Sequence, residues 1–145
     1  MNEDLLIGKY RAIVVNNNDP KNMGRITVMC PSALGDYEST WCIPCIPTLG
    51  DNIGIMRIPK VGEAVWVEFE GGSPNYPIWT GGWSVPNSCP NTLDNQYVIK
   101  IGQSTLTIKE TGELSYNVNS RQVLKIDNNG IVIKGNLKVE GTITN

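Results

Sequence analysis

The stretch that most constrains the fold is residues 61–83, VGEAVWVEFEGGSPNYPIWTGGW. Over residues 63–70 polar and apolar side chains alternate, so Val65, Val67 and Phe69 share one face of an extended segment. The two glycines and two prolines that follow keep the next residues out of a helix and out of a sheet interior. The stretch therefore predicts two short strands joined by a stiff, proline-bearing loop.

Composition indicates that this strand pair belongs to an all-β chain. The 145 residues include 15 glycines and 9 prolines, only 18% are charged, and no long run has helical spacing. Further extended segments are predicted over residues 8–15, 25–30 and 40–47. Short strands broken by Gly/Pro loops fit a closed barrel, because closure removes the sheet edges that they would expose. We predict a five-stranded OB-fold barrel over residues 1–83.

The core of this barrel is expected to hold the inward-facing side chains of its strands. These residues are Ile26, Val28, Val65, Val67, Phe69 and Ile78.

A second module follows a linker. Residues 84–95 contain two prolines and three asparagines without periodicity, which is typical of a linker. Residues 96–145 contain no proline, cysteine or tryptophan, and apolar residues alternate in short runs separated by turn residues. A ribbon with one apolar face needs a second surface to cover it. It could fold onto its own barrel, or three copies could surround a shared axis, which the steady alternation favours.

We therefore predict that residues 96–145 form a needle, an intertwined trimeric β-helix. Its core is expected to contain the apolar residue of each alternating pair. These residues are Leu106, Ile108, Leu114, Tyr116, Val118, Leu124, Ile126, Ile131, Ile133, Leu137, Val139 and Ile143.

Charge and the N-terminal sequence narrow the possible partners and location. A net charge of -2 and a pI near 5.1 supply no basic field for phosphates, so no nucleic-acid partner is expected. Residues 1–7 are acidic at the start and have only three consecutive apolar residues, unlike a signal peptide. No window reaches membrane-spanning length. The sequence predicts a protein made in the cytoplasm.

The four cysteines allow three interpretations. Cys42 and Cys45 have the spacing of a redox pair, but the neighbouring prolines keep this segment extended. Cys30 and Cys89 could complete a structural zinc site with four thiolate ligands. Plain buried thiols are the favoured interpretation.

Other conspicuous residues also have a structural interpretation beside a functional one. Glu68 and Glu70 could form a carboxylate pair, but without histidine or a nucleophile motif a solvated or subunit-facing edge is favoured. Residues 127–130 resemble the start of a calcium loop, although a hairpin turn suffices. Four tryptophans could stack bases or sugars, but packing is favoured. These are Trp41, Trp66, Trp79 and Trp83. We predict no enzymatic activity, no cofactor and no metal.

Taken in order, several segments resemble the OB domain of the phage baseplate assembly protein V family. They are residues 8–14 (GKYRAIV), Asp19-Pro20 leading to residues 24–28 (GRITV), residues 41–47 (WCIPCIP) and residues 59–83, which begin PKVG. The family forms the central spike of contractile phage tails and is related to the spikes of type VI secretion and extracellular contractile injection particles. Its OB domain is followed by a trimeric β-helical needle.

The resemblance implies a structural protein. It implies a homotrimer at the baseplate centre under the tail tube, in contact with baseplate hub and tail-tube proteins, that helps to pierce the target-cell envelope. Such a protein is assembled into the baseplate of a virion or extracellular injection particle. The alternative is an oligomeric OB-fold module that binds oligosaccharide or single-stranded nucleic acid.

Two departures from the family modify this expectation. Some relatives carry a lysozyme domain between barrel and needle, for which residues 84–95 leave no room. Some needles bind iron through paired histidines, and this chain has no histidine. The expected needle therefore ends against a separate tip protein.

Overall fold

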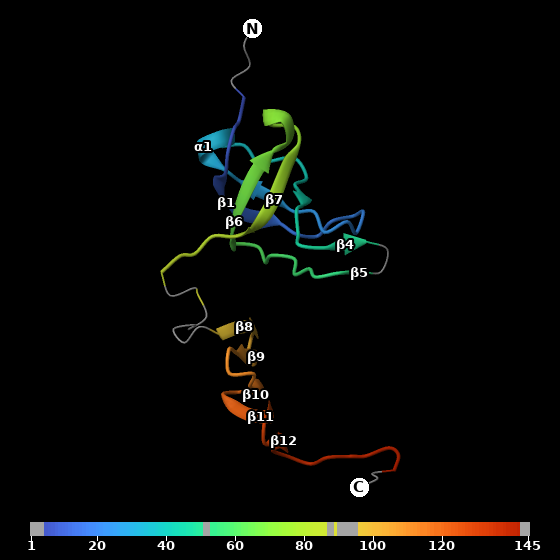
Figure 1. Cartoon of the computed structure of the whole chain (residues 1–145). Coiled ribbons are helices and arrows are strands. Elements are labelled where there is room, and N and C mark those ends of the chain that lie inside the picture. Colours follow the sequence, from blue (N-terminus) through green and yellow to red (C-terminus); the bar gives the residue numbers. More distant parts are fainter. Residues whose placement is uncertain (1–4, 51–52, 87–88, 90–95, 143–145) are drawn as a thin grey trace. The chain divides into compact units, whose positions relative to one another are not determined.

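The chain folds into two compact units, residues 1–86 and residues 87–145 (Figure 1). The computed structural model describes residues 5–50, 53–86, 89 and 96–142. In this part of the chain the helical elements are the single turns α1 (Pro31–Leu34) and η1 (Glu70–Gly72), and the rest of the regular structure is strand. The prediction of an all-β chain is confirmed. The division between the units falls within the predicted linker, most of which lies outside the described residues.

The N-terminal unit is built on a five-stranded sheet. Its strands are β1 (Tyr10–Asn16), β2 (Thr27–Met29), β3 (Ile43–Pro44), β6 (Ala64–Phe69) and β7 (Pro77–Gly82). Their order is β2-β1-β6-β7-β3, and all neighbours are antiparallel except β3 and β7, which are parallel. The main sheet of this unit thus has the predicted five strands.

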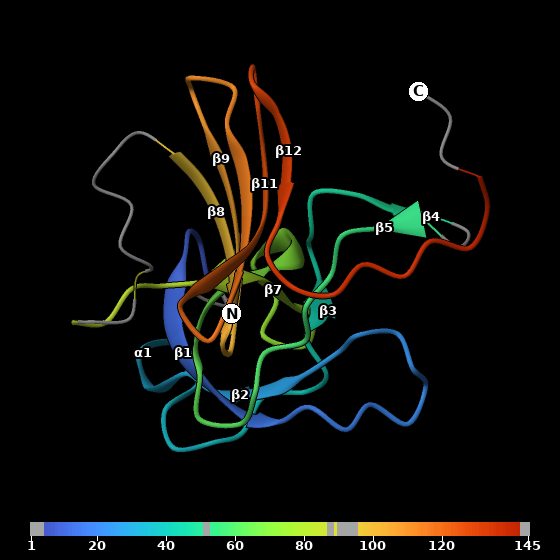
Figure 2. The ribbon, with the colours of Figure 1, turned by 90° about the horizontal axis from the view of Figure 1, so that it is seen from below.

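The sheet curls until its two ends meet (Figure 2). The amide of Cys42 donates to the carbonyl of Ile26 at 2.8 Å, and the amide of Ile26 donates back at 3.2 Å. This reciprocal pair joins the chain next to β2 to the chain next to β3, so the strands follow one another around a closed ring as β1-β2-β3-β7-β6. The arrangement is a small OB-like barrel.

The barrel core contains alternate residues of the strands. The buried apolar side chains are Ala12, Val14, Ile26, Val28, Cys30, Cys42, Val65, Val67, Phe69 and Trp79. Five of the six residues expected in the core lie in this set. Ile78 is only half-buried, because the register pairs it with outward-facing Glu68, whereas Trp79 pairs with Val67.

Two connections of the N-terminal unit contain short regular elements. Residues 31–34 form α1, whose first position is a proline, a residue well suited to the first turn of a helix. Between β3 and β6 the chain forms a small antiparallel hairpin of β4 (Leu49–Gly50) and β5 (Ile53–Gly54). Its apolar side chains Leu49 and Ile53 are exposed.

An aspartate organises the loop between β1 and β2. The carboxylate of Asp19 accepts hydrogen bonds from the amides of Lys21, Met23 and Arg25 at 2.7–3.2 Å, and it pairs with the Arg25 guanidinium at 2.6 Å. The Arg25 guanidinium in turn lies over the Trp41 ring. The Arg25 guanidinium, and after it these amides, hold the pKa of Asp19 well below its ordinary range, against the opposing effect of burial.

The C-terminal unit is a five-stranded antiparallel meander. Its strands are β8 (Gln96–Ile101), β9 (Ser104–Lys109), β10 (Leu114–Val118), β11 (Arg121–Asp127) and β12 (Gly130–Ile133). Each pairs with the next along the chain, in the order β12-β11-β10-β9-β8. The turn between β10 and β11 uses Asn119 and Ser120, both with positive φ, as a tight hairpin turn requires.

The end of this unit corrects one expectation. The alternating residues Leu137 and Val139 predicted a further strand, but residues 134–142 form none and both side chains are exposed. Ile143 lies outside the described residues. After the amide of Lys134 donates to the carbonyl of Val123, the chain leaves the sheet near the end of β12 and pairs with no other strand of the described residues. Within one chain the unit is therefore a single-layer meander and not a β-helix.

We expect Ile26→Ala to lower the free energy of unfolding of the barrel by about 2–5 kcal/mol, because it removes a fully buried side chain from a closed core. Urea denaturation followed by tryptophan fluorescence measures the loss. The matched control is Ile13→Ala, on the outer face of β1 and 40% exposed, for which about 1 kcal/mol or less is expected. Equal losses for the two variants would contradict the described core.

A second variant tests the loop aspartate. Asp19→Asn removes the charge that pairs with Arg25, so the wild type should be more stable than the variant at neutral pH. A lowered pKa in the folded protein contributes stability above the ordinary aspartate pKa and loses it as the pH falls toward the lowered value. The difference in urea midpoint between the two proteins should therefore shrink from neutral pH to about pH 3. A difference independent of pH would refute this role.

Candidate interaction site

The C-terminal sheet presents two apolar rows on one face. The cross-strand registers align one residue from each of the five strands in each row. The first row is Tyr97, Ile108, Leu114, Ile126 and Ile131, and the second is Ile99, Leu106, Tyr116, Leu124 and Ile133. Directly opposed side chains on one face of a sheet contact one another. The rows therefore form a continuous apolar surface, which we call the apolar face.

Much of the apolar face is open to solvent. Ile131 is 65% exposed, Tyr97 is 66% exposed, and Ile133, Ile99 and Ile108 are each more than 40% exposed. The leucines of the central strands are half-buried by their neighbours in the rows. Contiguous exposed apolar surfaces of this kind mark sites of association.

The opposite face of the same sheet is polar and internally paired. Lys125 contacts both Asp127, at 2.6 Å, and Glu113, at 3.6 Å, and Glu113 also pairs with Lys109 at 2.9 Å. The hydrogen bond from the Lys109 ammonium lowers the pKa of Glu113. The hydrogen bond to the Asp127 carboxylate raises the pKa of Lys125. This face thus carries the ion pairs of the sheet and is suited to water, in contrast to the apolar face.

Eight of the twelve residues expected in the needle core stand in the two rows. Val118 is half-buried at the end of β10, opposite Ser104 and Arg121. Leu137 and Val139 follow the last strand and join neither row. The sequence analysis did not identify β8 and its contributions to the rows, because an apolar Val98 between Tyr97 and Ile99 obscures the alternation.

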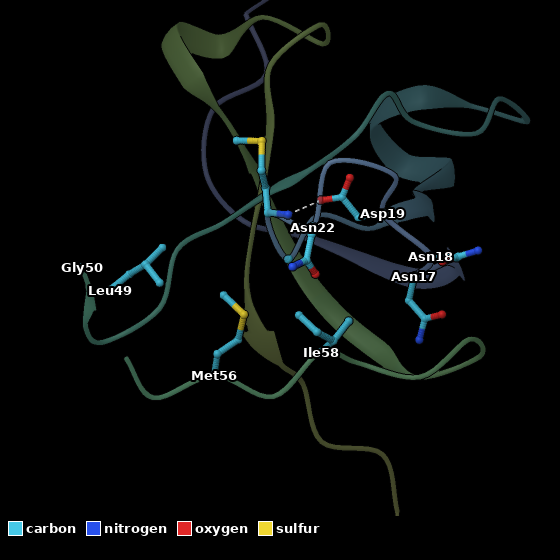
Figure 3. Close-up of a pocket in the computed structure, with 10 residues that line it drawn as sticks. Asn17, Asn18, Asp19, Asn22, Leu49, Gly50, Met56 and Ile58 are labelled. Carbon is cyan, nitrogen blue, oxygen red and sulfur yellow. Dashed lines mark hydrogen bonds between the residues drawn. The ribbon is translucent and has the colours of Figure 1, made fainter. Parts of the chain in front are cut away.

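The N-terminal unit contains a pocket of about 570 Å³ between the β1–β2 loop and the segment around β4 and β5 (Figure 3). Asn17, Asn18 and Asp19 line one side, and Met56 and Ile58 line the other (Figure 3). None of its described lining residues is aromatic or basic. It therefore lacks the stacking platforms and cationic groups with which OB folds hold bases.

Two of the cysteines are packed as thiols in the barrel core. Cys30 and Cys42 are buried, whereas Cys45 and Cys89 are exposed. Burial raises the pKa of the Cys42 thiol to about 11 and also raises that of Cys30, so both are protonated at neutral pH and poorly nucleophilic. In the described ranges no group of three or more His, Cys, Asp or Glu side chains is arranged to hold a metal ion.

The tryptophans interact with groups of the chain itself. Trp79 is buried and donates to the carbonyl of Gly24 at 3.1 Å, and Trp41 lies under Arg25. Trp66 and Trp83 lie together on the outside of the barrel beside Arg11.

The two acidic motifs are likewise involved in local structure. Glu68 pairs with Lys9, and Glu70 begins the 3-10 turn η1. Asp127 accepts a hydrogen bond from the amide of Asn129 within the hairpin turn. Among the described residues no helix is long and apolar enough to span a membrane.

Comparison with known proteins identifies the barrel. Over 77 residues the chain is 35% identical to the type VI secretion system spike protein VgrG3 of Vibrio cholerae serotype O1 (strain ATCC 39315 / El Tor Inaba N16961). The aligned region covers 50% of this chain and 8% of that relative, so the chain spans only a small part of the relative's length. Residues 10–83, from the first residue of β1 to the residue after β7, match the family described as the type VI secretion system/phage-baseplate injector OB domain. A closed five-stranded barrel that matches this family over half of the sequence shows that the chain belongs to the type VI secretion system/phage-baseplate injector OB domain family.

Proposed function

We propose that this protein is a structural central spike of a contractile tail or injection machine and that it acts as a homotrimer. The observation that carries the proposal is the apolar face, which is left uncovered on a sheet joined by a short linker to an injector-family barrel. The family match supports a spike-related role for the barrel. The trimer and the piercing function are our proposal.

Other copies of the chain are the proposed cover for the apolar face. Burying the part of these ten side chains that is still exposed in one chain contributes on the order of 10 kcal/mol per chain to the free energy of association. This is enough to drive association. Identical chains related by a rotation axis present the same face to that axis. Three copies would enclose their apolar faces and leave the ion-paired faces in water. The resemblance seen in the sequence favours three copies over two.

The proposed mechanism is mechanical. Contraction of the surrounding sheath supplies the force, and a needle whose core is shared between chains resists bending and helps to breach the target-cell envelope. The barrels would contact baseplate hub and tail-tube proteins, and a separate tip protein would complete the C-terminal end. The protein would be assembled into the baseplate of a virion or an extracellular injection particle.

A catalytic or ligand-binding role is less well supported. The pocket beside the β1–β2 loop offers no stacking ring or cation among its described lining residues, and the buried thiols are protonated. We therefore propose neither an enzymatic activity nor a cofactor or metal. The alternative of an oligosaccharide- or nucleic-acid-binding module has no specific observation in its favour.

The trimer gives a direct expectation for mass. The chain of 15.9 kDa should behave in solution as a particle of about 48 kDa. Size-exclusion chromatography with multi-angle light scattering measures this mass at micromolar concentration. A monomer would refute association through the apolar face, and a stable dimer would refute the threefold arrangement.

Two neighbouring residues of β12 test which face is enclosed. Ile133 stands in the apolar face opposite Leu124, whereas Val132 stands on the polar face opposite Lys125. Ile133→Asp would bring three like charges into the shared core, and an unpaired buried charge costs several kcal/mol. We expect this variant to lose the trimer, as measured by light scattering.

Val132→Asp is the matched control, because it introduces the same charge on the same strand but facing Lys125. It should remain trimeric, with a thermal unfolding profile close to that of the wild type. A trimer that tolerates Ile133→Asp and dissociates with Val132→Asp would show that the faces have been assigned the wrong way round.

A further inference from the structure

The end of β7 contains a bulge that changes the direction of its side chains. Val67 pairs with Trp79 but Val65 pairs with Gly82, so three steps along β7 match two steps along β6. Gly81, within the bulge, has φ 109°, which glycine adopts without strain. One extra residue moves every later side chain to the other face of the sheet. Trp83 thereby lies outside the barrel, although the alternation of β7 before the bulge would direct it inward.

On the outside, Trp83 becomes part of a three-residue cluster. The guanidinium carbon of Arg11 lies 5.0 Å from the ring centroid of Trp83 and 5.8 Å from that of Trp66. The two ring centroids are 6.4 Å apart with an interplanar angle of 54°. The indole N–H of Trp83 donates to the backbone carbonyl of Ala12 at 3.4 Å. Residues next to β7 are thus connected to β1 and β6.

The cluster lies where the backbone ladder between β6 and β7 is interrupted. The bulge interrupts the pairing of β6 and β7, and Gly81 and Gly82 have no side chains to pack. Beyond Gly82 the chain leaves the sheet, since residues 83–86 belong to no strand. The contacts of Trp83 with β1 and β6 therefore act at the point where the regular pairing of β6 and β7 ends.

Arg11 is well suited to hold the two rings together. It is the cross-strand partner of Trp66, and within the described part of the chain it forms no ion pair. A guanidinium within about 6 Å of an aromatic face is attracted by the ring quadrupole. Its charge is thus shared between the rings and water.

We propose that Arg11, Trp66 and Trp83 form an exit clasp. The clasp holds the bulged end of β7 on the barrel and fixes the point at which the chain leaves it. Because Trp83 is followed directly by the connection to the C-terminal unit, tension along the chain reaches the barrel at the clasp first. The inference concerns contacts inside the N-terminal unit and holds whether or not the protein is a trimeric spike.

Hydrogen exchange of the full-length protein, measured by mass spectrometry on peptides that cover residues 80–86, tests the clasp. Losing the cation–π contacts in Arg11→Ala should accelerate exchange in these peptides by about fivefold. Trp83→Ala removes both the ring and its hydrogen bond and should accelerate it further. Arg11→Lys, which retains a cation, should lie between the wild type and Arg11→Ala.

The matched control is Lys9→Ala. Lys9 also projects from the outer surface, where it contacts Glu68 and lies 3.5 Å from Thr80 before the bulge, without contributing to the ring cluster. This variant should leave exchange over residues 81–86, beyond its contact with Thr80, unchanged. Unchanged exchange in both Arg11→Ala and Trp83→Ala would overturn the clasp. Acceleration spread evenly over the whole barrel would also overturn it, because it would indicate general destabilisation.

Discussion

The backbone pairing of Ile26 with Cys42 is the constraint on which the N-terminal unit depends. If the sheet were open, its edge strands β2 and β3 would leave backbone amides and carbonyls unpaired. Once the ends of the sheet meet, these groups are satisfied around the ring, and the inward-facing residues share one core. Closure also explains how the N-terminal unit encloses a core within one chain despite the modest apolar content of the sequence.

The C-terminal sheet has the same alternation but no closure. Its strands lie in simple sequence order, so β8 and β12 stay at the edges. One face is made suitable for water by Lys125 and its acidic partners, and the other has two apolar rows. The two units thus differ in how the apolar side of each sheet is covered. The barrel covers its own apolar side, whereas the sheet leaves that side for association.

The bulge in β7 connects the architecture of the barrel to the point where the chain leaves it. A regular strand would have directed Trp83 inward, toward a core already filled by Trp79 and its neighbours. The extra residue instead places Trp83 against Arg11 and Trp66. The side-chain direction of Trp83 is therefore decided by the local irregularity in strand pairing. The apolar character of tryptophan alone would not have placed the ring on the outer surface.

The sequence by itself determined most of the strand segments and which side of most strands is apolar. Val65, Val67 and Phe69, and eight residues of the apolar face, could be identified because side-chain direction alternates strictly along one strand. Only the tertiary structure decided the features that depend on a partner strand, namely register, bulges and membership of a sheet. Register left Ile78 outside the core, and the bulge turned Trp83 outward. Residues 134–142 stayed out of the sheet because they pair with no strand of the described part of the chain. Hydrogen-bond pairing joins residues distant in sequence, and the pattern within one segment does not specify it.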